Sequence, residues 1–125
     1  MLINFSNHPY ETWNDDMRRA AAEYGETVDF PFPHIEPDLS VDELRELVLK
    51  LSEKIEAMKP AAVFAAGEFT FLFMMVDKLL TDGVKVICSC SKRLTEEIRL
   101  PNGANEKKSV FVFKCFREYD YFQKG

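Results

Sequence analysis

Six consecutive apolar residues, Ala61–Ala66, occupy the middle of this 125-residue chain. Pro60 precedes the run and Gly67 follows it. A strand that is apolar on both faces is typical of the centre of a parallel sheet with helices on both sides. The run therefore predicts an α/β fold, and its small side chains would let a helix pack closely against the sheet.

Strand-like and helix-like segments alternate on both sides of this run. Residues 2–5, 26–30 and 84–88 are further short apolar or alternating runs, which predict strands. Ser40 and Glu43 have the spacing of a capping box, and apolar residues recur at helical spacing after them. Helices are expected from Asn14 to Gly25, from Ser40 to Pro60 and from about Glu68 to Asp82. The apolar stretch Phe69–Met75 is interpreted as core.

The last part of the chain has a different pattern. Thr95–Leu100 and Ser109–Tyr119 alternate and flank Pro101-Asn102-Gly103, which predicts an antiparallel hairpin after a fourth strand that ends at Cys88. The whole pattern predicts a three-layer Rossmann-like α/β sandwich with a mostly parallel sheet and a C-terminal antiparallel hairpin. We expect one domain over residues 1–125, with residues 91–122 as an appended β-hairpin, and neighbouring central strands through Ile3 and Val63.

Composition narrows the classes of function. A net charge of −5 argues against binding along duplex nucleic acid, which needs a basic face. No apolar run has the length of a membrane span, and no signal peptide is visible at the N-terminus. Three cysteines without regular spacing indicate reduced thiols, hence a cytoplasmic protein, and Cys88 and Cys90 are poorly spaced for a metal. We expect no metal, no cofactor and no membrane partner.

Two polar strings follow predicted strands. Ser6, Asn7 and His8 end the first strand, and Gly67, Glu68 and Thr70 follow the central one. The carboxyl ends of parallel strands meet at one edge of the sheet, where open α/β folds bind ligands. We therefore expect these side chains in one cleft, together with residues that follow the fourth strand, namely Ser91, Lys92 and Arg93.

Each candidate residue has a chemical role and a structural alternative. The amides after Gly67 and the Arg93 guanidinium would bind phosphate, while Ser6, Asn7 and Thr70 would orient a ribose or base. His8 is the candidate for proton transfer, or else bonds the loop backbone. Glu68 would repel a phosphate, so either the ligand presents a hydroxyl or a base at this point, or Glu68 acts as a base, a nucleophile or a metal ligand. The structural alternative is that Glu68 only caps its helix. Ser91, Lys92 and Arg93 supply local positive charge, or form a solvated turn.

The two polar strings, the size and the order of elements over roughly residues 1–92 resemble the CRISPR-associated Rossmann-fold proteins, in particular the stand-alone ancillary forms found beside type III systems. The resemblance implies a homodimer that binds a cyclic oligoadenylate in prokaryotic antiviral defence, and in some members cleaves it as a metal-independent ring nuclease. Glu68 departs from the neutral or basic phosphate-binding turn of that group.

Two other classes of function remain open. A nucleoside- or nucleotide-processing enzyme, similar to the deoxyribosyltransferases, would use Glu68 as the carboxylate that attacks or stabilises the sugar. A non-catalytic interaction protein would use its aromatic C-terminal hairpin instead. That hairpin holds more aromatic residues than one sheet face requires, so part of the set is expected to pack against a second copy: Phe111, Phe113, Phe116, Tyr119, Tyr121 and Phe122.

Overall fold

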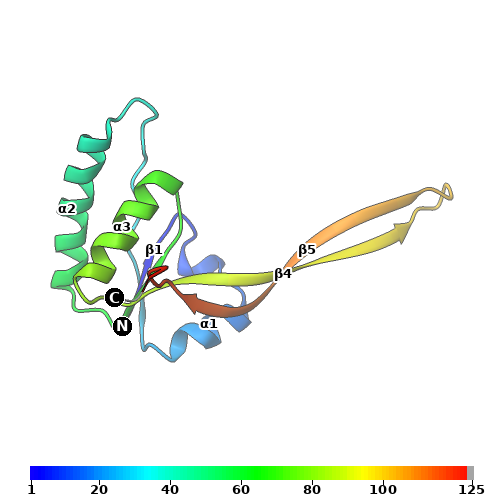
Figure 1. Ribbon diagram of the computed structural model, residues 1–125. Helices are drawn as coiled ribbons and strands as arrows, with labels where there is room; N and C mark the ends of the chain where they lie inside the picture. Colours follow the sequence, from blue (N-terminus) through cyan, green and yellow to red (C-terminus); the bar gives the residue numbers. More distant parts are fainter. Residues whose placement is uncertain (124–125) are drawn as a thin grey trace.

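The computed structural model describes residues 1–123 and contains one five-stranded sheet in the order β2-β1-β3-β4-β5 (Figure 1). The strands β1 to β4 run parallel, and β5 pairs antiparallel with β4. Ile3 lies opposite Val63, so the predicted neighbouring central strands are confirmed. The strand bounds are β1 Leu2–Phe5, β2 Thr27–Asp29, β3 Ala62–Ala65, β4 Val86–Arg99 and β5 Asn105–Glu118.

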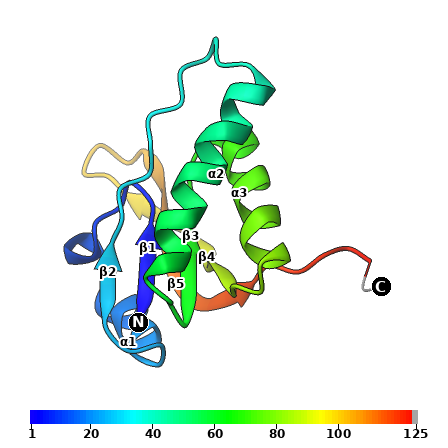
Figure 2. The same ribbon diagram turned by 90° about the vertical axis from the view of Figure 1, so that its left-hand side faces the viewer.

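Helices cover both faces of the sheet, as the apolar run on β3 predicts. One face packs α2 (Val41–Ala57) and α3 (Phe69–Thr81), which lie side by side (Figure 2). The other face packs α1 (Asp15–Ala22) together with Trp13, next to the short 3-10 helix η1 (Tyr10–Thr12). Alternate residues of β1 and β3 enter the two cores, because successive side chains of a strand point to opposite faces. The predicted mixed α/β fold is confirmed.

Local capping signals set the beginnings of two helices. The Asn14 side chain accepts a hydrogen bond from the Met17 amide and begins α1. Ser40 accepts from the Glu43 amide, and Glu43 accepts in return from the Ser40 amide, which completes the predicted capping box of α2. None of the helices within residues 1–123 combines the length and hydropathy that crossing a membrane requires.

The fourth strand does not end at Cys88, and this part of the prediction is wrong. β4 continues without a break to Arg99 and pairs with β5 along its whole length. A register shift lies between Cys90 and Ser91, where Lys114 is the extra residue on β5. A bulge of this kind bends a strand pair and increases its twist. Beyond it the hairpin leaves the body of the protein as a projecting arm, defined here as residues 91–113 (Figure 1).

Candidate functional site

The order of strands places a switch point between β1 and β3. From β1 the chain crosses to β2 on one side, and from β2 it returns to β3 on the other side of β1. Open α/β sheets bind ligands in the crevice outside the carboxyl ends of the strands at such a point. The loop after β1 and the turn after β3, which carry the two polar strings, meet at this edge.

A buried hydrogen-bond network fixes the loop after β1. Asn4 is only 1% exposed, and its amide donates 2.8 Å bonds to the Asp29 carboxylate and to the backbone carbonyl of His8. The Ser6 hydroxyl donates to the Asn4 side-chain oxygen at 2.6 Å and accepts from the His8 amide at 3.2 Å. The Trp13 indole also donates to the His8 carbonyl, at 3.0 Å. Because the network holds the backbone at His8 from several directions, the loop has one defined conformation.

The three consecutive polar residues Ser6, Asn7 and His8 have different roles in this loop. Ser6 is buried, and its hydroxyl serves the loop itself. Asn7 and His8 are exposed and present their side chains to solvent at the switch point. The backbone of His8 is held in place, whereas its imidazole is left accessible. A shallow hollow of about 250 Å³ adjoins this loop and is lined by Ser6, Asn7, Pro9, Asp29 and Pro31.

The turn after β3 is built around a close contact at Gly67. A Cβ atom at this position would lie 2.4 Å from the ring of Phe32, closer than any real side-chain contact. Phe32 is buried and packs against the rings of Phe5 and Phe71. Glycine is therefore required here because the Phe32 ring occupies the place of a side chain, and the turn lies directly against the core.

Glu68 caps α3 with its own carboxylate. Its two oxygens accept hydrogen bonds from the Thr70 amide at 3.1 Å and the Phe71 amide at 2.8 Å, and from the Thr70 hydroxyl. These bonds, led by the Phe71 amide, lower the pKa of the Glu68 carboxyl. The amides predicted to receive a phosphate are thus occupied by an anionic side chain, and the capping alternative describes the contacts that Glu68 makes.

This cap predicts a specific pH dependence. A lowered carboxyl pKa stabilises the fold above the unfolded-state value and loses that contribution as the pH falls through the folded-state value. Wild-type protein should therefore lose more stability between about pH 5 and pH 3 than Glu68→Gln, which has no carboxylate to protonate. Urea unfolding of both proteins across this range measures the difference. Equal losses would show that the cap contributes nothing to folding.

The cationic candidates lie on the arm. Ser91 pairs with Phe113 and Lys92 with Val112, and the Arg93 guanidinium donates to the Ser109 hydroxyl at 3.1 and 3.2 Å. Ile87 is the last β4 residue that pairs with β3. Arg93 follows it by six residues, or about 20 Å along an extended strand. The predicted site residues thus form three groups: the β1 loop, the α3 cap and the base of the arm.

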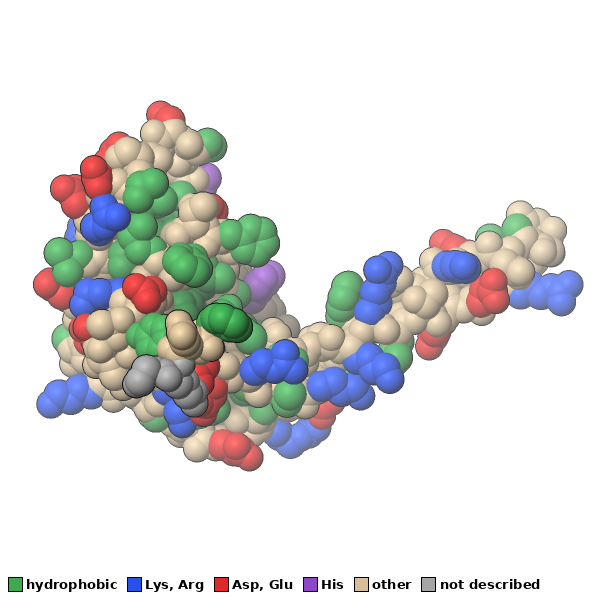
Figure 3. All heavy atoms as spheres, viewed as in Figure 1, with side chains coloured by type: hydrophobic (Ala, Val, Ile, Leu, Met, Phe, Trp, Pro, Cys, Tyr) green, Lys and Arg blue, Asp and Glu red, His purple; other side chains and the backbone are tan. Residues whose placement is uncertain are grey.

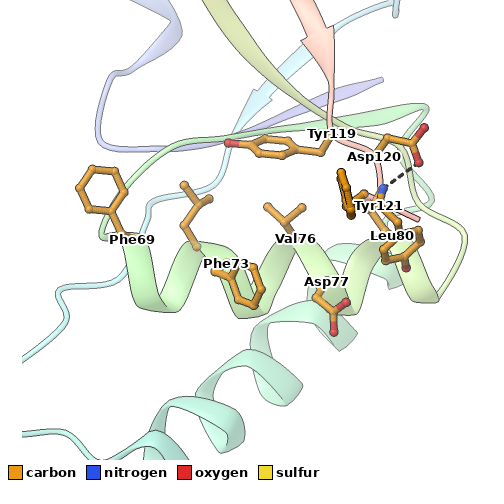
Figure 4. Close-up of a pocket in the computed structure, with 10 residues that line it drawn as sticks. Phe69, Phe73, Val76, Asp77, Leu80, Tyr119, Asp120 and Tyr121 are labelled. Atoms are coloured by element: carbon orange, nitrogen blue, oxygen red, sulfur yellow. Dashed lines mark hydrogen bonds between the residues drawn. The ribbon is translucent and has the colours of Figure 1, made fainter. Parts of the chain in front are cut away.

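The structure also contains an apolar groove that is larger than the hollow beside the β1 loop and that the sequence did not predict. It has a volume of about 530 Å³ and lies between α3 and the segment that follows β5 (Figure 4). Phe71 and Met75 are buried as predicted, but Phe69 is 85% exposed and Phe73 is 78% exposed. The signal for this surface was their four-residue spacing, which places both on one helix face. The lining residues are Phe69, Leu72, Phe73, Val76, Asp77, Leu80, Tyr119, Asp120, Tyr121 and Phe122.

A family model described as "Uncharacterized protein MJ1673 family" matches residues 1–117, which include both strand-end strings and the whole arm. No curated protein and no solved structure matches the chain. Within residues 1–123, no group of three or more His, Cys, Asp or Glu side chains is arranged to hold a metal ion.

Proposed function

The chain belongs to the MJ1673 family, and we propose that it is a nucleotide-binding protein whose ligand lies at the switch point between β1 and β3. The observation that carries this proposal is the hydrogen-bond network of the buried Asn4 and Ser6 with the exposed Asp29, which fixes the loop that displays Asn7 and His8. Polar groups inside a strand are costly to bury. A rigid loop that presents exposed polar side chains is the kind of support that a preorganised binding site needs.

The chemistry of the displayed side chains favours a nucleotide. The Asn7 amide has both donors and acceptors and can pair with a base edge or with ribose hydroxyls. The His8 imidazole can donate to a phosphate and can transfer a proton near neutral pH. The hollow beside them holds about 250 Å³, less than a pocket for a whole drug-sized ligand, so it fits one base or sugar.

We propose a cyclic oligoadenylate as the ligand, in keeping with the resemblance of the two strand-end strings to CRISPR-associated Rossmann-fold proteins. A role in antiviral defence follows from that ligand. Its phosphates would be received by His8 and by the cations at the base of the arm, because Glu68 occupies the amides of α3. The three free cysteines favour the reducing cytoplasm as the location.

A second candidate is a nucleoside-processing enzyme with Glu68 as its nucleophile. The observation that favours it is the position of the exposed Glu68 carboxylate, directly after β3 at the switch point. Glycosidic bond cleavage that is lost in Glu68→Gln would support this enzyme. Ligand binding that survives Glu68→Gln, without release of a base, would support the binding protein.

The test is calorimetric titration with cyclic oligoadenylates, mononucleotides and nucleosides. Asn7→Ala should weaken binding of the nucleotide about tenfold, since it removes one or two hydrogen bonds of about 1 kcal/mol each. The matched control is Asn105→Ala, which removes an exposed amide from the outer part of the hairpin and should bind as wild type does. Equal affinities of the two variants, or no binding of any nucleotide by wild type, would contradict the proposal.

His8→Ala separates binding from chemistry at the same site. If the protein cleaves its ligand with His8 as the proton-transfer group, turnover should fall by a factor of about 100 or more in this variant. Affinity should change less, because the imidazole is one of several contacts. Chromatographic detection of linear products measures turnover. Wild-type turnover in His8→Ala would remove His8 from the mechanism.

A further inference from the structure

The apolar groove beside α3 exposes more hydrophobic side-chain area than a protein surface usually does. Phe122 is fully exposed, and Phe69 and Phe73 are almost as open. In Figure 4, Tyr119 lies across from Val76, and Tyr121 stands beside Leu80. A hydrogen bond between the Tyr121 hydroxyl and Thr81 fastens this segment to α3. Large contiguous apolar patches of this kind mark interaction surfaces.

The arm has a matching apolar face. Leu94 lies directly opposite Val110, and Val112 and Ile98 fall on the same face, because residues that pair across two strands share a face. Leu94, Ile98 and Val110 are each about 40% exposed. An isolated two-stranded hairpin is marginally stable in water. The arm therefore carries an apolar face that needs a partner, and the body of its own chain does not cover it (Figure 3).

Charge is divided between the arm and the rest of the chain. The arm, residues 91–113, carries five Lys or Arg and three Asp or Glu. The remaining residues carry 11 Lys or Arg and 18 Asp or Glu. The face of the arm that holds Leu94 also carries Lys92, Lys108, Glu96 and Glu106, and Asp77 lies in the groove. The arm as a whole has a net positive charge and the rest of the chain a net negative charge, which favours the association of an arm with a body and opposes that of two arms.

We propose that two copies of this chain associate reciprocally, with the arm of each copy lying in the apolar groove of the other. Nine residues of β4 in the arm, from Ser91 to Arg99, span about 30 Å, and the 13 residues of α3 span about 20 Å. The arm is thus long enough to cover the groove. The angle between body and arm leaves an open notch that accepts the body of a second copy (Figure 3).

Two charge insertions test the two halves of this contact. Phe73→Glu places a carboxylate in the groove, and Leu94→Glu places one on the apolar face of the arm. Both side chains are exposed in the single chain, so each variant should fold. The matched controls carry the same new charge elsewhere: Leu49→Glu on the exposed side of α2, and Thr95→Glu on the opposite face of the arm.

Sedimentation equilibrium at about 50 μM, suited to micromolar association, measures the outcome. Wild type and both controls should be dimers, and each test variant should dissociate at least about tenfold more readily. An equal mixture of Phe73→Glu and Leu94→Glu should associate more tightly than either variant alone. A mixed dimer regains one intact contact, because the arm of the groove variant meets the groove of the arm variant.

Four results would overturn the proposal. A monomeric wild type would exclude the association. Dimers that survive Phe73→Glu would indicate arm-to-arm pairing, and dimers that survive Leu94→Glu would indicate groove-to-groove packing. A mixture that associates no better than its components would contradict reciprocal exchange even if both single variants are monomers.

Discussion

Replacing Asn4 by aspartate is expected to lower the free energy of unfolding by about 3–5 kcal/mol at pH 7. The substitution keeps the size of the side chain but turns its amide donor into a carboxylate oxygen. That oxygen would face the Asp29 carboxylate, which the amide now contacts at 2.8 Å, and the carbonyl of His8. The new charge would be buried at a position that is 1% exposed, beside the charge of the exposed Asp29 and without the lost donor. Urea unfolding measures the loss.

The cause of this loss can be separated from a general effect of added charge. Two carboxyl groups that share a site hold a proton to a higher pH than usual, and a shared proton restores one hydrogen bond. The deficit of Asn4→Asp should therefore shrink as the pH falls below about 5. The control is Asn14→Asp at the N-cap of α1, where aspartate caps equally well and stability should be unchanged. A fully stable Asn4→Asp would show that the network does not hold the loop.

Gly67→Ala is expected to destabilise the protein by about 1–3 kcal/mol, the usual cost of overpacking a core. Gly67 does not have the left-handed backbone of Gly83, so the cost comes from the Phe32 ring and not from backbone strain. A double-mutant cycle isolates this contact. Gly67→Ala should cost less in a Phe32→Leu background than in wild type, because the ring no longer fills the space.

Gly83→Ala is the contrasting variant for this cycle. An added Cβ at Gly83 meets no atom within 4 Å, but its φ of +85° is unfavourable for alanine. Its cost should be the same with and without Phe32→Leu. If Gly67→Ala and Gly83→Ala both respond equally to Phe32→Leu, the close approach of the ring is not what selects glycine at position 67.

The fold follows from local sequence signals to a large degree. The Ala61–Ala66 run, the Ser40–Glu43 capping box and the Asn14 cap each act over a few residues, and the strand and the two helices that they predict are present. The continuous β4 strand could not be predicted in this way. Ser89, Ser91, Lys92 and Arg93 are exposed and polar. They are held extended by pairing with β5, whose partner residues lie 18–27 residues away along the chain. Only the structure supplies that register.

The candidate site was predictable in position but not in its internal contacts. Parallel pairing of β1 and β3 brings the two polar strings to one edge, as expected. In the sequence, Asn4 is a single polar residue within an apolar strand. Its hydrogen-bond partner Asp29 lies beside it only because β1 pairs with β2, and local sequence does not show that pairing. In the same way, Phe69 and Phe73 resemble core residues until the position of α3 shows which of its faces the sheet covers.

The proposed nucleotide site lies at the fixed loop between β1 and β3. The most direct measurement is titration of isotopically labelled protein with a cyclic oligoadenylate, followed by the amide resonances in two-dimensional NMR. We expect the resonances of Asn7, His8, Gly67 and Glu68 to shift first and to saturate together. Shifts confined to the apolar groove around Phe69 and Phe73, or no shifts at all, would contradict it.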